Sequence, residues 1–256
     1  MLAMEREGIK QFPVRPNLAD VARFEFFANG PVRKFGVWIV RQPGIHFALP
    51  FVTGPKAATS DYEPMPHGFP GLAVPVEKIY PCLVPFLELE DGRTIAAVDG
   101  ADEIRPAADG MSVTAVWKRW VVAGAKAGDS ADQGLVSEVT WSIQGDTLRR
   151  VESFRSSKPL RVRRLWLAIP SLYARLETLD TGGHRLDRFS SEKETLDVQV
   201  KQSDWPVEIS AFSTGDDPLG RSDRGPIPLH LILESKNISL SPGAPEKWEL
   251  TLSAHP

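Results

Sequence analysis

The 256-residue chain is long enough to bury a substantial core, and 42% hydrophobic with 25% charged residues is the composition of a globular protein rather than a disordered one. The net charge of −3 is too small to predict a nucleic-acid partner, and the lone Cys82 excludes an intrachain disulfide framework and a cysteine-based zinc site. No apolar run approaches the length of a membrane-spanning helix, so no membrane partner is expected.

Residues 1–20 are expected to form an N-terminal extension, because no convincing helix or strand pattern opens the chain. They do not combine a cationic start with an apolar segment, so no signal peptide is visible. Two interpretations remain open. The protein is cytoplasmic, or it is a fragment of a longer secreted chain whose targeting signal lies upstream.

The segment 17–27 is the best helix candidate, with Asn17 as its N-cap, but the alternation of Ala22, Phe24 and Phe26 with polar residues favours a strand. Residues 35–40 are apolar throughout, which predicts a central strand covered on both faces. The Pro43-Gly44 pair that follows suits the tight turn of a hairpin.

The proline-rich segment 59–93 is unusually long for an irregular connection. Asp61, Tyr62, Glu63 and His67 fall within seven residues of it, and neighbouring prolines fix the backbone. We expect residues 61–71 to be ordered at one end of the fold or on its concave face, with Tyr62 or His67 at the mouth of a pocket. Such a loop could supply an acid–base pair. The alternative is a packed crossover in which His67 bonds to a backbone carbonyl.

Trp117 and Trp120 are three residues apart in the segment 112–122. If that segment is one regular strand, the two indoles face opposite sides of the sheet, and both cannot lie in the same core. One of them would then offer a flat surface on which a sugar ring can stack. The alternative is that a loop or the other sheet covers the second face.

Strict alternation of apolar and polar residues recurs along the chain, most clearly at 135–143, 196–200 and 247–252. Roughly fifteen strand-like segments are separated by clusters of Gly, Pro, Asp and Ser, whereas helical periodicity is almost absent. The predicted fold is therefore all-β, a large antiparallel two-sheet sandwich formed as a single domain by residues 21–256. We expect Trp38, Trp141, Trp166, Val198 and Trp248 to lie in its core.

Basic residues are concentrated between 149 and 164, where Arg149, Arg150, Arg155 and Lys158 precede three further arginines. Lys158-Pro159 is expected in the turn of a hairpin. In the strand after it, Arg161 and Arg163 should point one way, and Leu160, Val162 and Arg164 the other. This predicts a basic stripe suited to carboxylates or sulfates. The alternative is a solvated outer face whose arginines pair with acids of neighbouring strands.

Signals for metal or cofactor binding are weak. The five histidines are scattered without ligand spacing, and Asp216, Asp217 and Asp223 lack the ligand order of a calcium loop. No glycine-rich phosphate motif and no nucleophile elbow is present. We therefore predict neither a metal nor a cofactor.

The segments VTWSIQGDTLRRVESF (139–154) and PLRVRRLWLAIP (159–170), with the number of strands, resemble the β-supersandwich of galactose-mutarotase-like domains and of heparinase II/III-like polysaccharide lyases. The resemblance covers about residues 21–252. In those lyases it implies a cleft between a helical toroid and the β-domain, with much of the chemistry on the toroid. This sequence holds no toroid, so the resemblance implies a separate helical toroid domain as a candidate partner.

Three hypotheses follow. The first is a carbohydrate-binding or carbohydrate-processing domain for an acidic glycan, with Asp61, Glu63, Trp117, Trp120, Arg161 and Arg163 contacting the sugar. The second is a polysaccharide lyase in which Tyr62 and His67 exchange protons with the substrate and an arginine neutralises its carboxylate. The third is a structural or interaction domain without a small ligand.

Overall fold

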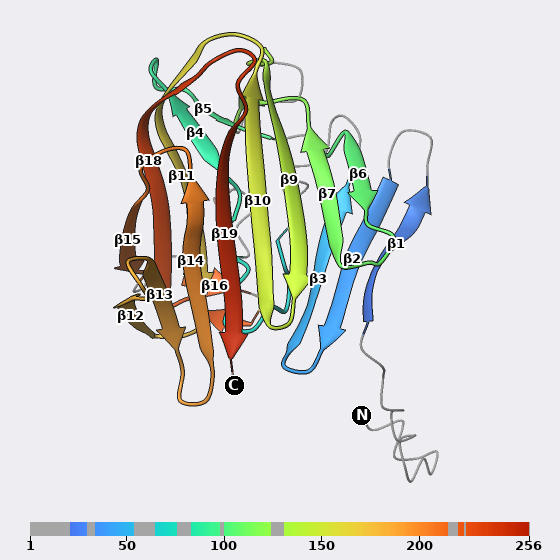
Figure 1. The fold of residues 1–256 in the computed structure, drawn as a ribbon, viewed down its shortest axis with the longest axis vertical. Coiled ribbons are helices and arrows are strands. Elements are labelled where there is room, and N and C mark those ends of the chain that lie inside the picture. Colours follow the sequence, from blue (N-terminus) through green and yellow to red (C-terminus); the bar gives the residue numbers. More distant parts are fainter. Residues whose placement is uncertain are drawn as a thin grey trace.

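The computed structural model describes residues 21–29, 34–53, 65–75, 83–97, 100–123, 131–214, 220–222 and 224–255. Nearly all regular structure within these residues is β-strand, and every pair of named strands is antiparallel (Figure 1). The prediction of an all-β antiparallel sandwich is confirmed. None of the described residues forms a helix of the length and apolarity needed to cross a membrane.

Two large sheets make up most of the fold. The first has eight strands in the spatial order β12 (Arg175–Asp180), β13 (Arg185–Ser190), β14 (Thr195–Ser203), β19 (Glu246–His255), β10 (Thr147–Ser156), β9 (Leu135–Gln144), β7 (Ser112–Trp117) and β6 (Glu103–Pro106). The second has six strands in the order β15 (Glu208–Ser213), β18 (Leu229–Leu240), β11 (Leu160–Ser171), β4 (Phe86–Leu89), β5 (Thr94–Ala96) and β8 (Val121–Val122).

Two smaller sheets complete the described structure. One consists of β1 (Val21–Asn29), β2 (Lys34–Gln42) and β3 (Ile45–Val52), and the other of β16 (Arg221–Ser222) and β17 (Gly225–Pro226). The three-stranded sheet lies beside β6 and β7, on the right in Figure 1, where the Trp38 indole N–H donates to the carbonyl of Gly110 at 2.7 Å. The described part of the segment 17–27, which begins at Val21, forms a strand rather than a helix. The central position of the strand at 35–40 and the Pro43-Gly44 turn are confirmed. The expectation that both faces of this strand are covered is wrong, because Trp38 and Val40 are buried whereas Ile39 on the other face is only half-buried and Phe35 is exposed.

The eight- and six-stranded sheets share one main core, to which the three-stranded sheet also contributes. Alternate residues of β9 are buried, as the sequence pattern predicts, and so are Trp248, Leu250 and Leu252 of β19. Thr251, expected on the polar face of β19, is buried as well. Trp38, Trp141, Val198 and Trp248 are all in this core, in agreement with the prediction. The prediction that Trp166 lies in the core is wrong, because this side chain is half-buried and belongs to a small separate cluster on the other face of β11.

The turn at Lys158-Pro159 does not form the predicted hairpin. β10 ends at Ser156 in the eight-stranded sheet, and β11 begins at Leu160 in the six-stranded sheet. The turn therefore carries the chain from one sheet to the other. Short loops with a central proline fit both geometries, so local sequence does not distinguish a hairpin from a crossing.

The described part of the proline-rich segment, residues 65–75, is ordered and connects three sheets at one end of the fold. His67 exchanges two backbone hydrogen bonds of 2.9 Å with Ala48 of β3. Further along, Leu72 pairs with Ser171 at the end of β11, and Pro75 pairs with Ser222 of β16. Asp61, Tyr62 and Glu63 lie outside the described residues.

Candidate anion-binding site

The outer face of β11 carries the arginines that the sequence pattern singles out. The pairing of β11 with β4 shifts register between Val162 and Arg164, which marks a β-bulge. Because of this bulge, Arg163 and Arg164 both reach carboxylates on the outer face, and the expectation that Arg164 points inward with Leu160 is wrong. Alternation correctly predicts that Arg161 and Arg163 are exposed, with 73% and 65% of their side chains accessible.

Each of these arginines faces an acid of a neighbouring strand or turn. The guanidinium of Arg163 lies 3.1 Å from Glu88 of β4, and that of Arg161 lies 3.5 Å from Glu90 just after β4. The structure thus shows the ion pairs expected under the alternative interpretation, in which the arginines of a solvated outer face pair with acids of neighbouring strands. An ion pair that is exposed on both sides, such as Arg161–Glu90, contributes only about 0–1 kcal/mol, so a ligand can compete for the Arg161 guanidinium. Glu88 is only 25% accessible, so its pair with Arg163 is the firmer of the two, although Arg163 itself is mostly exposed to a ligand.

Arg164 is held more firmly than its neighbours. It pairs with Glu234 of β18, and its guanidinium carbon lies 4.6 Å from the ring centre of Trp166. Burial by itself raises the pKa of Glu234, but hydrogen bonds from Lys236 and Arg164 outweigh it, so the pKa lies below its usual value of 4.5. Arg164 therefore supports the sheet rather than offering a free donor.

A surface pocket of about 420 Å³ lies beside the exposed arginines. It is lined by Glu90, Arg161, Val162, Arg163, Asn237, Ile238 and Ser239. Asn237 has a φ of +54°, a left-handed conformation that asparagine tolerates better than most residues. Lys236 and Asn237 are consecutive exposed residues of β18 opposite the bulge of β11, so the alternation of buried and exposed residues is interrupted in both strands here.

The pocket presents donors and acceptors side by side. Two guanidinium groups can each bind a carboxylate or sulfate through paired N–H groups. Glu90 can accept from a ligand hydroxyl, and the side chains of Asn237 and Ser239 can donate or accept. No alternation signal pointed to Glu90, Asn237 or Ser239, because their role depends on which strands lie next to each other.

The other predicted site residues do not join this pocket. The His67 side chain is exposed, but its segment contacts β11 at Ser171, ten residues or about 33 Å along the strand from Arg161. In Figure 1 the start of β11 is at the top, and its end is at the bottom. The structure therefore does not bring His67 together with the basic stripe.

Trp117 and Trp120 are both buried, with 2% and 0% of their surface accessible, so the expectation that one indole is exposed to a sugar is wrong. The segment is not one regular strand. β7 ends at Trp117 in the eight-stranded sheet, and Val121 begins β8 in the six-stranded sheet. The chain crosses between the sheets here, so both indoles enter the same core.

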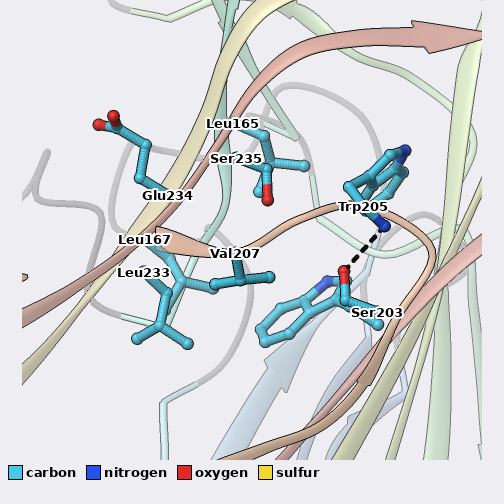
Figure 2. A pocket seen from close by; sticks show the side chains of 9 residues that line it. Leu165, Leu167, Ser203, Trp205, Val207, Leu233, Glu234 and Ser235 are labelled. Atoms are coloured by element: carbon cyan, nitrogen blue, oxygen red, sulfur yellow. Dashed lines mark hydrogen bonds between the residues drawn. The ribbon is translucent and has the colours of Figure 1, made fainter. Parts of the chain in front are cut away.

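A small apolar hollow lies between the two sheets, where Leu165, Leu167 and Val207 surround the space beside Trp205 (Figure 2). Its volume of about 10 Å³ is at the lower limit for one water molecule. Figure 2 shows the Glu234 carboxylate pointing away from it. This apolar hollow is a packing defect rather than a sugar site. Within the described ranges, no three His, Cys, Asp or Glu side chains are grouped to hold a metal ion.

Comparison with known proteins finds no matching family model and no match among curated proteins. Similar solved structures include an Escherichia coli K12 protein described as an aldose 1-epimerase (10% identity, TM-score 0.48, 86% of this chain and 99% of that chain). A polysaccharide lyase (12%, 0.43, 91% and 32%) and a heparinase III gene product (9%, 0.47, 94% and 36%) are also similar. This chain thus spans about a third of the latter two. These structures are of the same kinds as the families that the sequence resembles. Because their TM-scores are below 0.5, they do not assign a function to this chain.

Proposed function

We propose that this β-sandwich is a binding domain for an acidic carbohydrate, which it holds in the pocket around Arg161 and Arg163. One observation carries the proposal. Two arginines, each mostly exposed, line a pocket of about 420 Å³. That volume lies in the range of small-ligand sites.

The chemistry of the pocket favours an acidic sugar over a simple anion. The guanidinium forks suit a carboxylate or sulfate group, whereas Glu90 would repel any ligand that carries negative charge alone. A sugar that bears both an acidic group and hydroxyls can satisfy the arginines and still donate to Glu90. Ser239 and Asn237 add neutral partners for further hydroxyls.

Binding is preferred to lyase catalysis because no acid–base group among the described residues lies in this pocket besides Glu90. His67 belongs to the segment at the opposite end of β11. The participation of Tyr62 stays a prediction. Substituting His67 by alanine should therefore leave the affinity for acidic oligosaccharides unchanged, whereas a lyase that used His67 would lose its ability to shorten them.

Calorimetric titration with a uronic-acid disaccharide, and with a neutral disaccharide of the same size, tests the proposal. The Arg161→Gln/Arg163→Gln variant should bind the acidic sugar at least about ten-fold more weakly, since each lost charge-assisted contact is worth about 1.5–3 kcal/mol. The control is Arg149→Gln, an exposed arginine on the opposite sheet that pairs with Glu249 at 2.5 Å.

We expect the control variant to bind like the unaltered protein, and added salt to weaken binding of the acidic sugar. Equal affinity for the acidic and neutral disaccharides would contradict the proposal. So would an Arg161→Gln/Arg163→Gln variant with unchanged affinity. Either result would favour the interpretation of a structural or interaction domain.

A further inference from the structure

We propose that the binding surface continues from the Arg161 pocket over the turn between β10 and β11 and onto the outer face of the eight-stranded sheet. The ligand is then a polyanionic glycan chain rather than a single acidic sugar. This inference rests on the proposed function and specifies the length of its ligand.

A second surface pocket, of about 200 Å³, lies on the outer face of β6, β7, β9 and β10. Two ion pairs cross it. Arg105 pairs with Glu138 at 2.6 Å, and Lys118 pairs with Glu103 at 2.5 Å. The hydrogen bond from Lys118 is the main cause that lowers the pKa of Glu103. Both acids are thus already matched by a cation of their own.

Arg155 supplies the unmatched positive charge of this pocket. It is exposed on β10 opposite Val136, and it makes no ion pair with any residue that the structure describes. Its guanidinium can therefore bind an anionic group without first giving up a partner. The second pocket holds three cations and two acids, which is a net positive charge.

Lys158 lies on the turn between the two pockets, and that turn is fixed from both sides. The Ser156 hydroxyl donates to the Lys158 carbonyl at 2.5 Å, and the Ser157 amide donates to the Gly134 carbonyl at 2.9 Å. Pro159 restricts its own φ and the backbone of Lys158 before it. The exposed Lys158 side chain therefore projects from a preordered turn.

Arg155, Lys158 and Arg161 follow one another at intervals of three residues around this end of the sandwich. Arg161 is six residues after Arg155, so the backbone between them spans at most about 21 Å. In Figure 1 the end of β10, the end of β7 and the start of β11 all lie at the top. β10 and β11 belong to different sheets, and two sheets packed face to face lie about 10 Å apart.

One sugar ring cannot fill pockets on both outer faces at once, but a chain of several rings can pass from one to the other over Lys158. Once one part of the chain is bound, each further contact that the same chain makes is intramolecular, and this raises the overall affinity. Affinity should therefore grow with chain length until the chain spans both pockets.

The test is a titration series with uronic-acid oligosaccharides from a disaccharide to a dodecasaccharide. The variants are Arg155→Gln/Lys158→Gln and Arg161→Gln/Arg163→Gln. The control is Arg149→Gln, which lies on the same face of β10 as Arg155 but six residues, or about 20 Å, away toward the other end of the strand. All five positions are exposed or half-exposed, and a thermal unfolding curve for each variant checks that it is folded.

We expect the unaltered protein to bind the dodecasaccharide at least about ten-fold more tightly than the disaccharide. Arg155→Gln/Lys158→Gln should abolish this gain with chain length, whereas Arg161→Gln/Arg163→Gln should weaken the binding of the disaccharide as well as of the dodecasaccharide. The control should retain both affinities. The salt dependence of dodecasaccharide binding should also be shallower in Arg155→Gln/Lys158→Gln.

Each opposing outcome removes a different claim. If affinity does not grow with length, or if Arg155→Gln/Lys158→Gln keeps the gain, the extended surface is wrong and the single-pocket proposal stands. If Arg161→Gln/Arg163→Gln binds the disaccharide normally, the single-pocket proposal itself fails. If a single-stranded oligonucleotide of equal charge binds as tightly as the dodecasaccharide, the glycan assignment is overturned.

Discussion

Arg150 and Glu152 form an ion pair inside the core, and removing one partner should be far more damaging than removing the arginine next to it. Their side chains are 1% and 0% accessible, and the Arg150 guanidinium lies 2.9 Å from Glu152. The indole N–H of Trp248 donates to the same carboxylate oxygen at 3.0 Å. The guanidinium carbon is 5.2 Å from the ring centre of Trp141 and 4.9 Å from that of Trp248.

Arg150→Met should lower the free energy of unfolding by about 3–5 kcal/mol, because it leaves a buried carboxylate without its counter-charge. Arg149→Met should cost no more than about 1 kcal/mol, since Arg149 is exposed and pairs with Glu249 on the outer face. Arg150→Met/Glu152→Leu should be more stable than Arg150→Met alone, because it removes the stranded charge.

The assay is urea unfolding at pH 7, followed by tryptophan fluorescence and circular dichroism, with all four proteins analysed at a common m-value. A cost below about 1 kcal/mol for Arg150→Met would refute the reasoning. A double variant less stable than Arg150→Met would also refute it, because the buried charge would then not be the cause of the loss.

Three further predictions concern stability. Trp141→Ala should cost about 3–5 kcal/mol in urea unfolding, the range for a large aromatic side chain in a packed core, and a cost below about 1 kcal/mol would contradict its burial. Gly71→Ala should cost at least about 2 kcal/mol, since φ is +75° and the new Cβ would lie 2.5 Å from the Tyr173 ring; unchanged stability would mean that the loop is placed differently. The lowered pKa of Glu234 stabilises the folded state above pH 4.5, and this stability is lost as pH falls through the folded-state pKa. The difference in unfolding free energy between the unaltered protein and Glu234→Gln should therefore shrink between pH 7 and pH 3, and a constant difference would contradict this.

The parts of the fold that depend on burial of one strand face could be predicted from the sequence. In β9, Val139, Trp141 and Ile143 alternate with polar residues and are buried as expected. In β11, the same rule identified Arg161 and Arg163 as exposed neighbours. Alternation reports the two-residue period of a strand and the side that faces the core, and it needs no knowledge of other strands.

The rest depends on contacts between distant residues. The bulge that turns Arg164 outward arises from pairing with β4, about seventy-five residues earlier in the chain. Asn237 and Ser239 reach the Arg161 pocket only because β18 pairs with β11. The burial of both Trp117 and Trp120 follows from a crossing between sheets, which resembles an ordinary strand in local composition.

The crossing after β10 gives a physical reason why so many cations can gather in one stretch of the chain. In a hairpin centred on Lys158, Arg155 and Arg161 would lie directly opposite each other on neighbouring strands, where like charges destabilise a sheet. Because the turn instead joins two sheets, the two arginines lie on opposite outer faces of the sandwich, separated by its thickness. Their repulsion is reduced by distance and by solvent, while the exposed Lys158 adds a third cation on the turn between them. The same geometry that sequence reasoning misjudged therefore relieves the repulsion and produces a basic rim, which a chain-like anion can follow from one face to the other.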